Sequence, residues 1–233
     1  PGSVAQALGD LYHDDDWYRK SLTISEKLGD RPGMAGSYHN LGMVAQHRGD
    51  LDQADGWYRK SLTIFEELGN RPGMADSYHQ LGMVAQDRGD LDQADDWYRK
   101  SLTIEEELGN RPGMATSYHQ LGIVAQLRGD LDQADGWYRK SLTIKEELGS
   151  TGQGITLAQM GLLAEQQGCL NEAFGYAIRA VALFEEFPHR SSGTSPAQLA
   201  RLTSQHGDTA LRDAWTATTG NQIPADVSNW IIE

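Results

Sequence analysis

Apolar residues recur at helical spacing along most of the chain, in segments that end at glycine. The clearest segment runs from residue 91 to residue 108, where Asp90 can cap the start and Gln93 stands in capping-box position. Gly109 follows the last apolar position and is placed to end the helix. The spacing of the apolar residues is typical of one face of an amphipathic helix. These residues are Leu91, Ala94, Tyr98, Leu102 and Leu108.

A second helix is predicted just before this one. Asn70 and Pro72 stand where a helix can begin, because proline is tolerated in the first turn. The helix then runs through SYHQLGMVAQ and is followed by Gly89, a candidate C-terminal cap. The pattern therefore predicts a pair of helices joined by a short turn.

This pair is repeated with a period of 40 residues. A single pair cannot bury its own apolar face, so stacked neighbours must cover it, and the ends need caps. The tail predicts three further helices over 195–207, 208–220 and 224–232, with Trp215, Trp230 and Ile231 covering the last pair. The expected organisation is a partial repeat at 1–30, three near-identical units at 31–150, an eroded fourth unit at 151–187 and capping helices at 188–233.

The repeated residues resemble the tetratricopeptide repeat. Each unit carries Tyr38-x2-Leu41-Gly42-x2-Ala45 and then Ala54-x3-Tyr58, or the equivalent 40 or 80 residues later. The resemblance implies an all-α, right-handed superhelical solenoid of antiparallel helix pairs with a helical C-terminal cap. The small residues would let the two helices approach, with Tyr38 and Tyr58 filling the space between them. The 40-residue length is similar to kinesin-light-chain-like and bacterial regulator repeats.

One position departs from this family pattern. Asp55, Asp95 and Asp135 stand where the family often has an aliphatic residue, and the sequence offers no reason for the change.

The three copies differ mainly along one stripe of the first helix. Four variable positions are spaced by 4, 3 and 4 residues, which places them within roughly 60° of arc, opposite the apolar face. Two invariant ladders, of histidine and glutamine, run beside them. In the family this face lines a concave groove that binds peptides. The predicted partner-binding residues are Gly36, His39, Asn40, Met43, Gln46, His47, Asp76, His79, Gln80, Met83, Gln86, Asp87, Thr116, His119, Gln120, Ile123, Gln126 and Leu127.

Three functions remain open at this point. The first is a non-catalytic scaffold that binds a peptide or helical segment of a partner protein in the groove. The second is a ligand- or peptide-sensing regulatory domain of a larger bacterial signalling protein. The third is a solenoid that self-associates through its uncapped N-terminal end. Drift of exposed positions after duplication would also produce a variable stripe.

The composition limits the kinds of molecule that the protein is expected to bind. The net charge of −13 argues against nucleic acid and against anionic membrane surfaces, since both bind clustered Lys and Arg. No apolar run reaches the ~20 residues of a membrane span. The single cysteine, Cys169, excludes an intrachain disulfide and fits a reducing, cytoplasmic location.

Catalytic and metal chemistry are not expected, and no cofactor is implied. Ser37, His39 and Asp55 recur in every unit, whereas a catalytic site is normally singular. Histidines of stacked repeats would stand at least ~8–10 Å apart, too far to share one zinc ion. A pH-dependent hydrogen bond from a histidine to a ligand, changing near pH ~6.5, is an alternative use. The three RGD sequences fit a turn between helices better than an adhesion motif.

Overall fold

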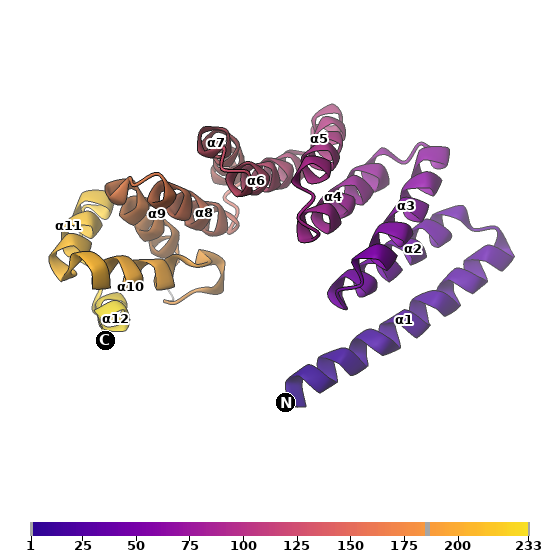
Figure 1. Cartoon of the computed structure of the whole chain (residues 1–233), viewed down its shortest axis with the longest axis horizontal. Coiled ribbons are helices and arrows are strands. Elements are labelled where there is room, and N and C mark those ends of the chain that lie inside the picture. Colours follow the sequence, from indigo (N-terminus) through magenta and orange to yellow (C-terminus); the bar gives the residue numbers. More distant parts are fainter. Residues whose placement is uncertain (1, 185–186, 233) are drawn as a thin grey trace. The chain divides into compact units, whose positions relative to one another are not determined.

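The computed structural model of this protein is helical, and it contains no strand in the residues it describes (Figure 1). The backbone is described for residues 2–184 and 187–232, and the side chains for residues 14–184 and 187–232. The chain divides into two compact units, residues 1–117 and 118–233. The boundary between the units falls within helix α6.

The first unit is built from consecutive helices that pack as pairs. Helix α2 packs on α3, and α4 packs on α5, each pair being joined by a short turn (Figure 1). The helices are α1 (Gly2–Leu28), α2 (Arg31–His47), α3 (Leu51–Leu68), α4 (Arg71–Asp87), α5 (Leu91–Leu108) and the start of α6 (Arg111–Leu127).

Local capping sets the ends of these helices. The side chain of Asp50 accepts a hydrogen bond from the Gln53 amide (3.1 Å), and Asn70 does the same for the Gly73 amide (3.1 Å). Gly49 has a φ of 78°, the left-handed conformation that lets the chain reverse between the two helices of a pair. Each RGD sequence is thus the turn inside a pair, as predicted.

The core of a pair forms around one tyrosine. Tyr58 is fully buried, and a Cβ on Gly42 would lie only 2.6 Å from its ring, so glycine is what lets the ring lie on α2. Ser61, on the same helix as Tyr58, is buried, and its hydroxyl is satisfied because it donates to the Ala35 carbonyl (2.9 Å). Tyr38 of α2 stacks on Trp57 of α3, 5.6 Å between ring centroids, so it also contacts the second helix, but it is partly exposed where Tyr58 is buried.

Asp55, one of the three aspartates that depart from the family pattern, links its own helix pair to the next one. Asp55 accepts two hydrogen bonds from the guanidinium of Arg59 (2.7 and 3.1 Å). Arg59 lies over the ring of Trp97 in the next pair, 5.3 Å from its centroid. A carboxylate at position 55 therefore holds a cation against the neighbouring repeat, where an aliphatic side chain would make a plain apolar contact.

The first helix differs from the expected partial repeat. Helix α1 runs without interruption from Gly2 to Leu28, across the LGD sequence that corresponds to the RGD turns of later copies. A continuous helix keeps its backbone hydrogen bonds through this segment, which a turn would interrupt.

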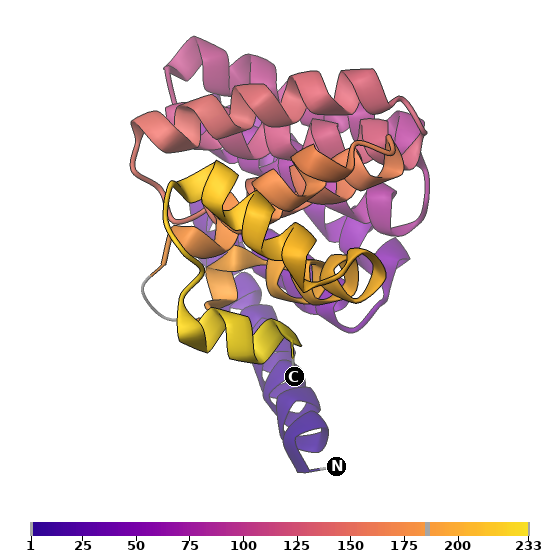
Figure 2. The same ribbon diagram turned by 90° about the vertical axis from the view of Figure 1, so that its left-hand side faces the viewer.

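The second unit continues the pairing and ends in a helical cap. Helix α8 packs on α7 and α9, α10 and α11 pack on α9, and α12 packs on α10 (Figure 2). The elements are α7 (Leu131–Glu147), α8 (Gln153–Gln166), α9 (Leu170–Ala182), a 3-10 turn η1 (Arg190–Ser192), α10 (Ser195–His206), α11 (Asp208–Thr219) and α12 (Ala225–Ile232). The three helices predicted for the tail are confirmed to within a residue.

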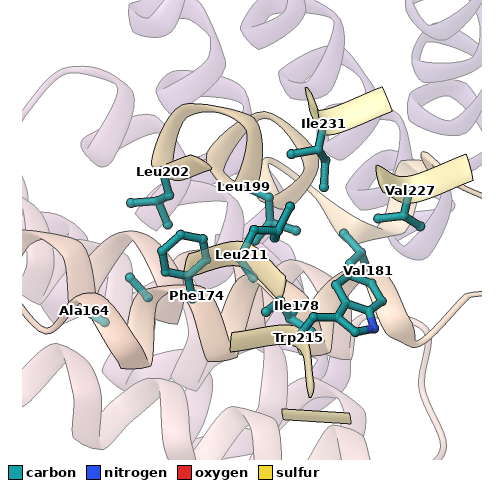
Figure 3. Close-up of a cluster of buried hydrophobic side chains, with 12 residues drawn as sticks. Ala164, Phe174, Ile178, Val181, Leu199, Leu202, Leu211, Trp215, Val227 and Ile231 are labelled. Atoms are coloured by element: carbon teal, nitrogen blue, oxygen red, sulfur yellow. The ribbon is translucent and has the colours of Figure 1, made fainter. Parts of the chain in front are cut away.

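The cap covers α9 with a cluster of apolar side chains. Trp215 lies beside Val181 and Val227, and Ile231 closes the cluster from α12 (Figure 3). Trp215 and Ile231 are buried as predicted. Trp230 is not, since 45 % of it is exposed and its ring meets Phe187 edge-on at 5.3 Å.

Candidate partner-binding stripe

The variable positions of α2 and α4 form a partly exposed surface in the first unit, here called the stripe. Its residues share one face of each first helix, at the positions predicted from their spacing. Met43 is 38 % exposed. His47, Asp76 and Asp87 are also exposed, while the others are half-buried. The stripe consists of Gly36, Asn40, Met43, His47, Asp76, Gln80, Met83 and Asp87.

The remaining predicted positions lie on α6. Thr116 is exposed and belongs to the first unit. In the second unit Leu127 is 59 % exposed, whereas Ile123 is half-buried and packs against the cluster around Tyr138. Gln120 is half-buried, and its Oε1 has no hydrogen-bond partner in the described residues. These positions thus range from open surface to the edge of the core.

The histidine ladder packs inward instead of projecting from the stripe. The rings of His39 and His79 lie 5.6 and 5.4 Å from those of Tyr58 and Tyr98. Burial lowers the pKa of His79 to about 4. Burial also lowers the pKa of His39, against an opposing effect of Asp76.

The third histidine follows the same rule. His119 packs on Tyr138, and burial together with nearby Lys145 lowers its pKa to about 3. A neutral histidine has no charge to lose near pH ~6.5. The lowered pKa values of His79 and His119 therefore argue against a ligand bond there that changes near pH ~6.5.

The glutamine ladder is partly used inside the protein. The hydroxyl of Tyr58 donates to Oε1 of Gln46 (3.1 Å), and Gln86 and Gln126 accept in the same way from Tyr98 and Tyr138. The amide nitrogen of Gln46 donates to Asp87 (2.9 Å). These bonds leave the glutamines less free to hold a peptide backbone than their spacing suggests.

The charge of the stripe is negative. Asp76 and Asp87 are its acidic residues, and it contains no Lys or Arg. Burial raises the pKa of Asp76, and His39 opposes that rise. A partner segment that carries acidic side chains would be repelled by this surface, whereas a neutral or basic one would not.

A further variable position lies on the second helix and was not assigned from the sequence. Phe65 lies against Gly73, near the start of α4, which is the first helix of the next pair. Glu105 lies in the same way against Gly113 of α6. Glu105 is 6 % exposed, and burial raises the pKa of its carboxyl group. The sequence did contain a signal for this contact. A glycine follows eight residues after the variable position in both copies, and its missing side chain leaves space for the variable one.

The residues considered for catalysis do not form a site. Ser37 donates to Ser21 (3.2 Å), His39 packs on Tyr58, and Asp55 binds Arg59. In the part of the chain whose side chains are described, no three His, Cys, Asp or Glu residues gather into a metal-binding group. Among the described helices, none has the length and apolarity needed to cross a membrane.

Comparison with known families decides the classification. A model described as tetratricopeptide repeat matches residues 2–67 and 73–147, more than half of the chain. The chain belongs to the tetratricopeptide repeat family. Members of this family are generally non-catalytic scaffolds for protein–protein interaction. No curated protein sequence matches the chain.

Solved structures support the fold of this tetratricopeptide repeat protein. BtubC (BKLC) from P. vanneervenii is 18 % identical, with a TM-score of 0.74 over 95 % of this chain and 90 % of that one. The apo form of RapI is 16 % identical, with a TM-score of 0.75 over 91 % of this chain and 60 % of that one. A putative kinesin light chain from Podosopora anserina is 18 % identical, with a TM-score of 0.63 over 82 % and 99 %. At these identities the likeness concerns the fold alone.

Proposed function

We propose that this tetratricopeptide repeat protein is a non-catalytic interaction scaffold whose stripe binds a peptide segment of a partner protein. The observation that carries the proposal is a contrast between the buried core of each pair, which is repeated, and one partly exposed face, which varies. The packing contacts around Tyr58 recur around Tyr98 with nearly the same distances. The positions that differ between the copies are concentrated on one partly exposed face.

The chemistry of the stripe fits an apolar segment with neutral or basic polar groups. Met43 and Met83 are flexible, polarisable side chains that adapt to varied apolar partners. Asn40 and Gln80 offer amide donors and acceptors for an extended backbone. Asp76 and Asp87 would repel an acidic segment, and the stripe has no Lys or Arg that could attract one.

Selection from a random peptide library tests the proposal. Peptides that bind the whole chain are selected, and their affinities are compared with those for a variant carrying Gln80→Ala and Met83→Ala. We expect the double substitution to weaken binding by ~1 kcal/mol or more, about fivefold or greater, because interface anchors typically cost this much when truncated.

A matched control changes a residue away from the stripe. Asp96 on α5 is exposed, and the other copies carry glycine at that position, so Asp96→Gly leaves the fold intact. This variant is expected to bind like the unchanged chain. Equal affinity of the unchanged chain and the stripe variant would show that the peptides bind elsewhere.

A further inference from the structure

Lys145 differs from the other lysines of the chain in its surroundings. Lysines 20, 27, 60, 100 and 140 are exposed, and three of them lie over aromatic rings. Lys145 is half-buried near the end of α7, at the position that holds Phe65 and Glu105 in the earlier copies. Its aliphatic carbons Cδ and Cε lie near Gly152, 3.7 Å from where a Cβ would stand.

Within the described part of the chain, the amino group of Lys145 contacts neutral polar groups only. Its Nζ donates to the hydroxyl of Thr156 (2.7 Å), a residue with no exposed surface. The Thr156 oxygen lies 3.2 Å from Nδ1 of His119, which burial keeps neutral. Because Thr156 accepts from the amine, its own proton is free to be donated to His119. The three side chains thus form one hydrogen-bonded cluster from α6, α7 and α8.

No carboxylate in the described residues pairs with this amine. Helix α8 contributes only hydroxyl and amide groups at this point, from Thr156 and Gln153. On α7 itself the carboxylate of Glu146 is engaged by Arg179 (2.9 Å). The N-cap of α8 also lacks a side-chain hydrogen bond, and the positive end of a helix disfavours a nearby ammonium. Burial lowers the pKa of Lys145 to about 8.

We propose that Lys145 is an acylation site that reacts directly with thioester acyl donors. The lone pair of neutral Nζ attacks the thioester carbonyl carbon, and the tetrahedral intermediate expels the thiolate. The surplus proton on nitrogen passes to the thiolate or to water, so that an amide and a thiol are formed. The amide product keeps an N–H that can be donated to Thr156 and removes a charge that no described carboxylate pairs with.

The free-base fraction explains why this lysine should react first. At pH 7.5 an amine with a pKa of about 8 is neutral in roughly one molecule in four, against about one in a thousand for an ordinary lysine. A less basic amine is also a weaker nucleophile, so the net gain in rate is expected to be about tenfold.

Competitive acetylation of the whole chain tests the proposal. The protein is incubated at pH 7.5 with S-acetyl-N-acetylcysteamine, and acetylation of each lysine is followed by peptide mass spectrometry. Lys140 is the matched control, because it lies five residues away on the same helix and is exposed. We expect Lys145 to react about tenfold faster than Lys140. A rate at Lys145 equal to or below that at Lys140 would overturn the proposal.

A second measurement tests whether the amine of Lys145 is bound by Thr156. Trace labelling with acetic anhydride between pH 6 and pH 10 should give a midpoint near pH 8 for Lys145. Thr156→Val removes the acceptor that favours the ammonium and should lower this midpoint, whereas Thr156→Ser should preserve it. A midpoint for Lys145 near the ~10.4 of an ordinary lysine would overturn the proposal, and a midpoint unmoved by Thr156→Val would show that Thr156 does not bind the amine.

Discussion

Two glycines of α2 differ in whether there is space for an added methyl group. A Cβ on Gly42 would lie 2.6 Å from Cε1 of Tyr58, a ring with no room to retreat because it is fully buried. A Cβ on Gly36 would meet nothing within 4 Å. The copies agree with this contrast, because position 36 becomes aspartate and then threonine, while position 42 is always glycine.

Alanine substitution at these two glycines should therefore change stability in opposite directions. We expect Gly42→Ala to lower the free energy of unfolding by about 1–3 kcal/mol through overpacking. Gly36→Ala should raise it by up to ~1 kcal/mol, since alanine favours the helix. Urea unfolding followed by circular dichroism measures both. A stabilising Gly42→Ala would mean that α2 and α3 are not held at the distance described.

At the scale of the element, the helix pairs are joined by an ionic contact as well as by apolar packing. Asp55 orients Arg59, and Arg59 lies over Trp97 of the next pair. Arg88 adds a second link, since it donates to Asp52 (2.6 Å) and approaches Asp55 (3.9 Å). Position 55 therefore contributes to stacking between repeats.

Removing the charge at position 55 should weaken this stacking modestly. We expect Asp55→Asn to lower the free energy of unfolding by ~0.5–1 kcal/mol, because the arginine is partly exposed and screened by solvent. The loss should shrink at high salt. The exposed residue Asp96 makes Asp96→Asn a matched control, expected to change little. A thermal melt of the two variants at low and high salt separates them, and equal behaviour would argue against the link.

Helix boundaries were predictable because the signals that set them are local. Asp90, Asn70 and Gly109 act within three residues of the ends that they define, and each does so in the structure. The continuous helix α1 was not predictable in this way. Its LGD sequence resembles the turns of the later copies, yet the backbone stays helical across it.

At the scale of the whole molecule, the periodicity of the sequence predicted which helix face carries the candidate site. It did not predict which residues the side chains of that face contact. The stripe lies opposite the buried face, as the spacing of its positions indicated. The contacts of the polar side chains beside it did not follow from the pattern, because their partners lie many residues away along the chain. Gln46 accepts a hydrogen bond from Tyr58, twelve residues away, and the ring of His79 packs on Tyr98, nineteen residues away. Such contacts depend on how helices pack, which a pattern of residue types does not state.

The buried histidines give the molecule a dependence of stability on pH. In the folded state the pKa of His79 is about 4 and that of His119 about 3, while an unfolded histidine titrates near ~6.5. Below pH ~6.5 the unfolded chain therefore binds protons that the folded chain does not. The stability that these neutral rings provide is complete above that pH and is lost as the pH falls toward about 4 and 3.

Between pH 7.5 and pH 5.5 each of the two histidines should thus remove about 1 kcal/mol from the free energy of unfolding. Asp76 and Glu105, whose pKa values are raised by burial, act in the opposite sense at lower pH, so the measurement belongs above pH 5.5. Urea unfolding at the two pH values gives the change directly. His79→Gln should reduce the difference by about 1 kcal/mol, with His47→Gln, at an exposed position, as the control. A pH-independent unfolding midpoint, or a His79 ring that titrates near ~6.5 by NMR, would contradict the packing of the ladder on its tyrosines.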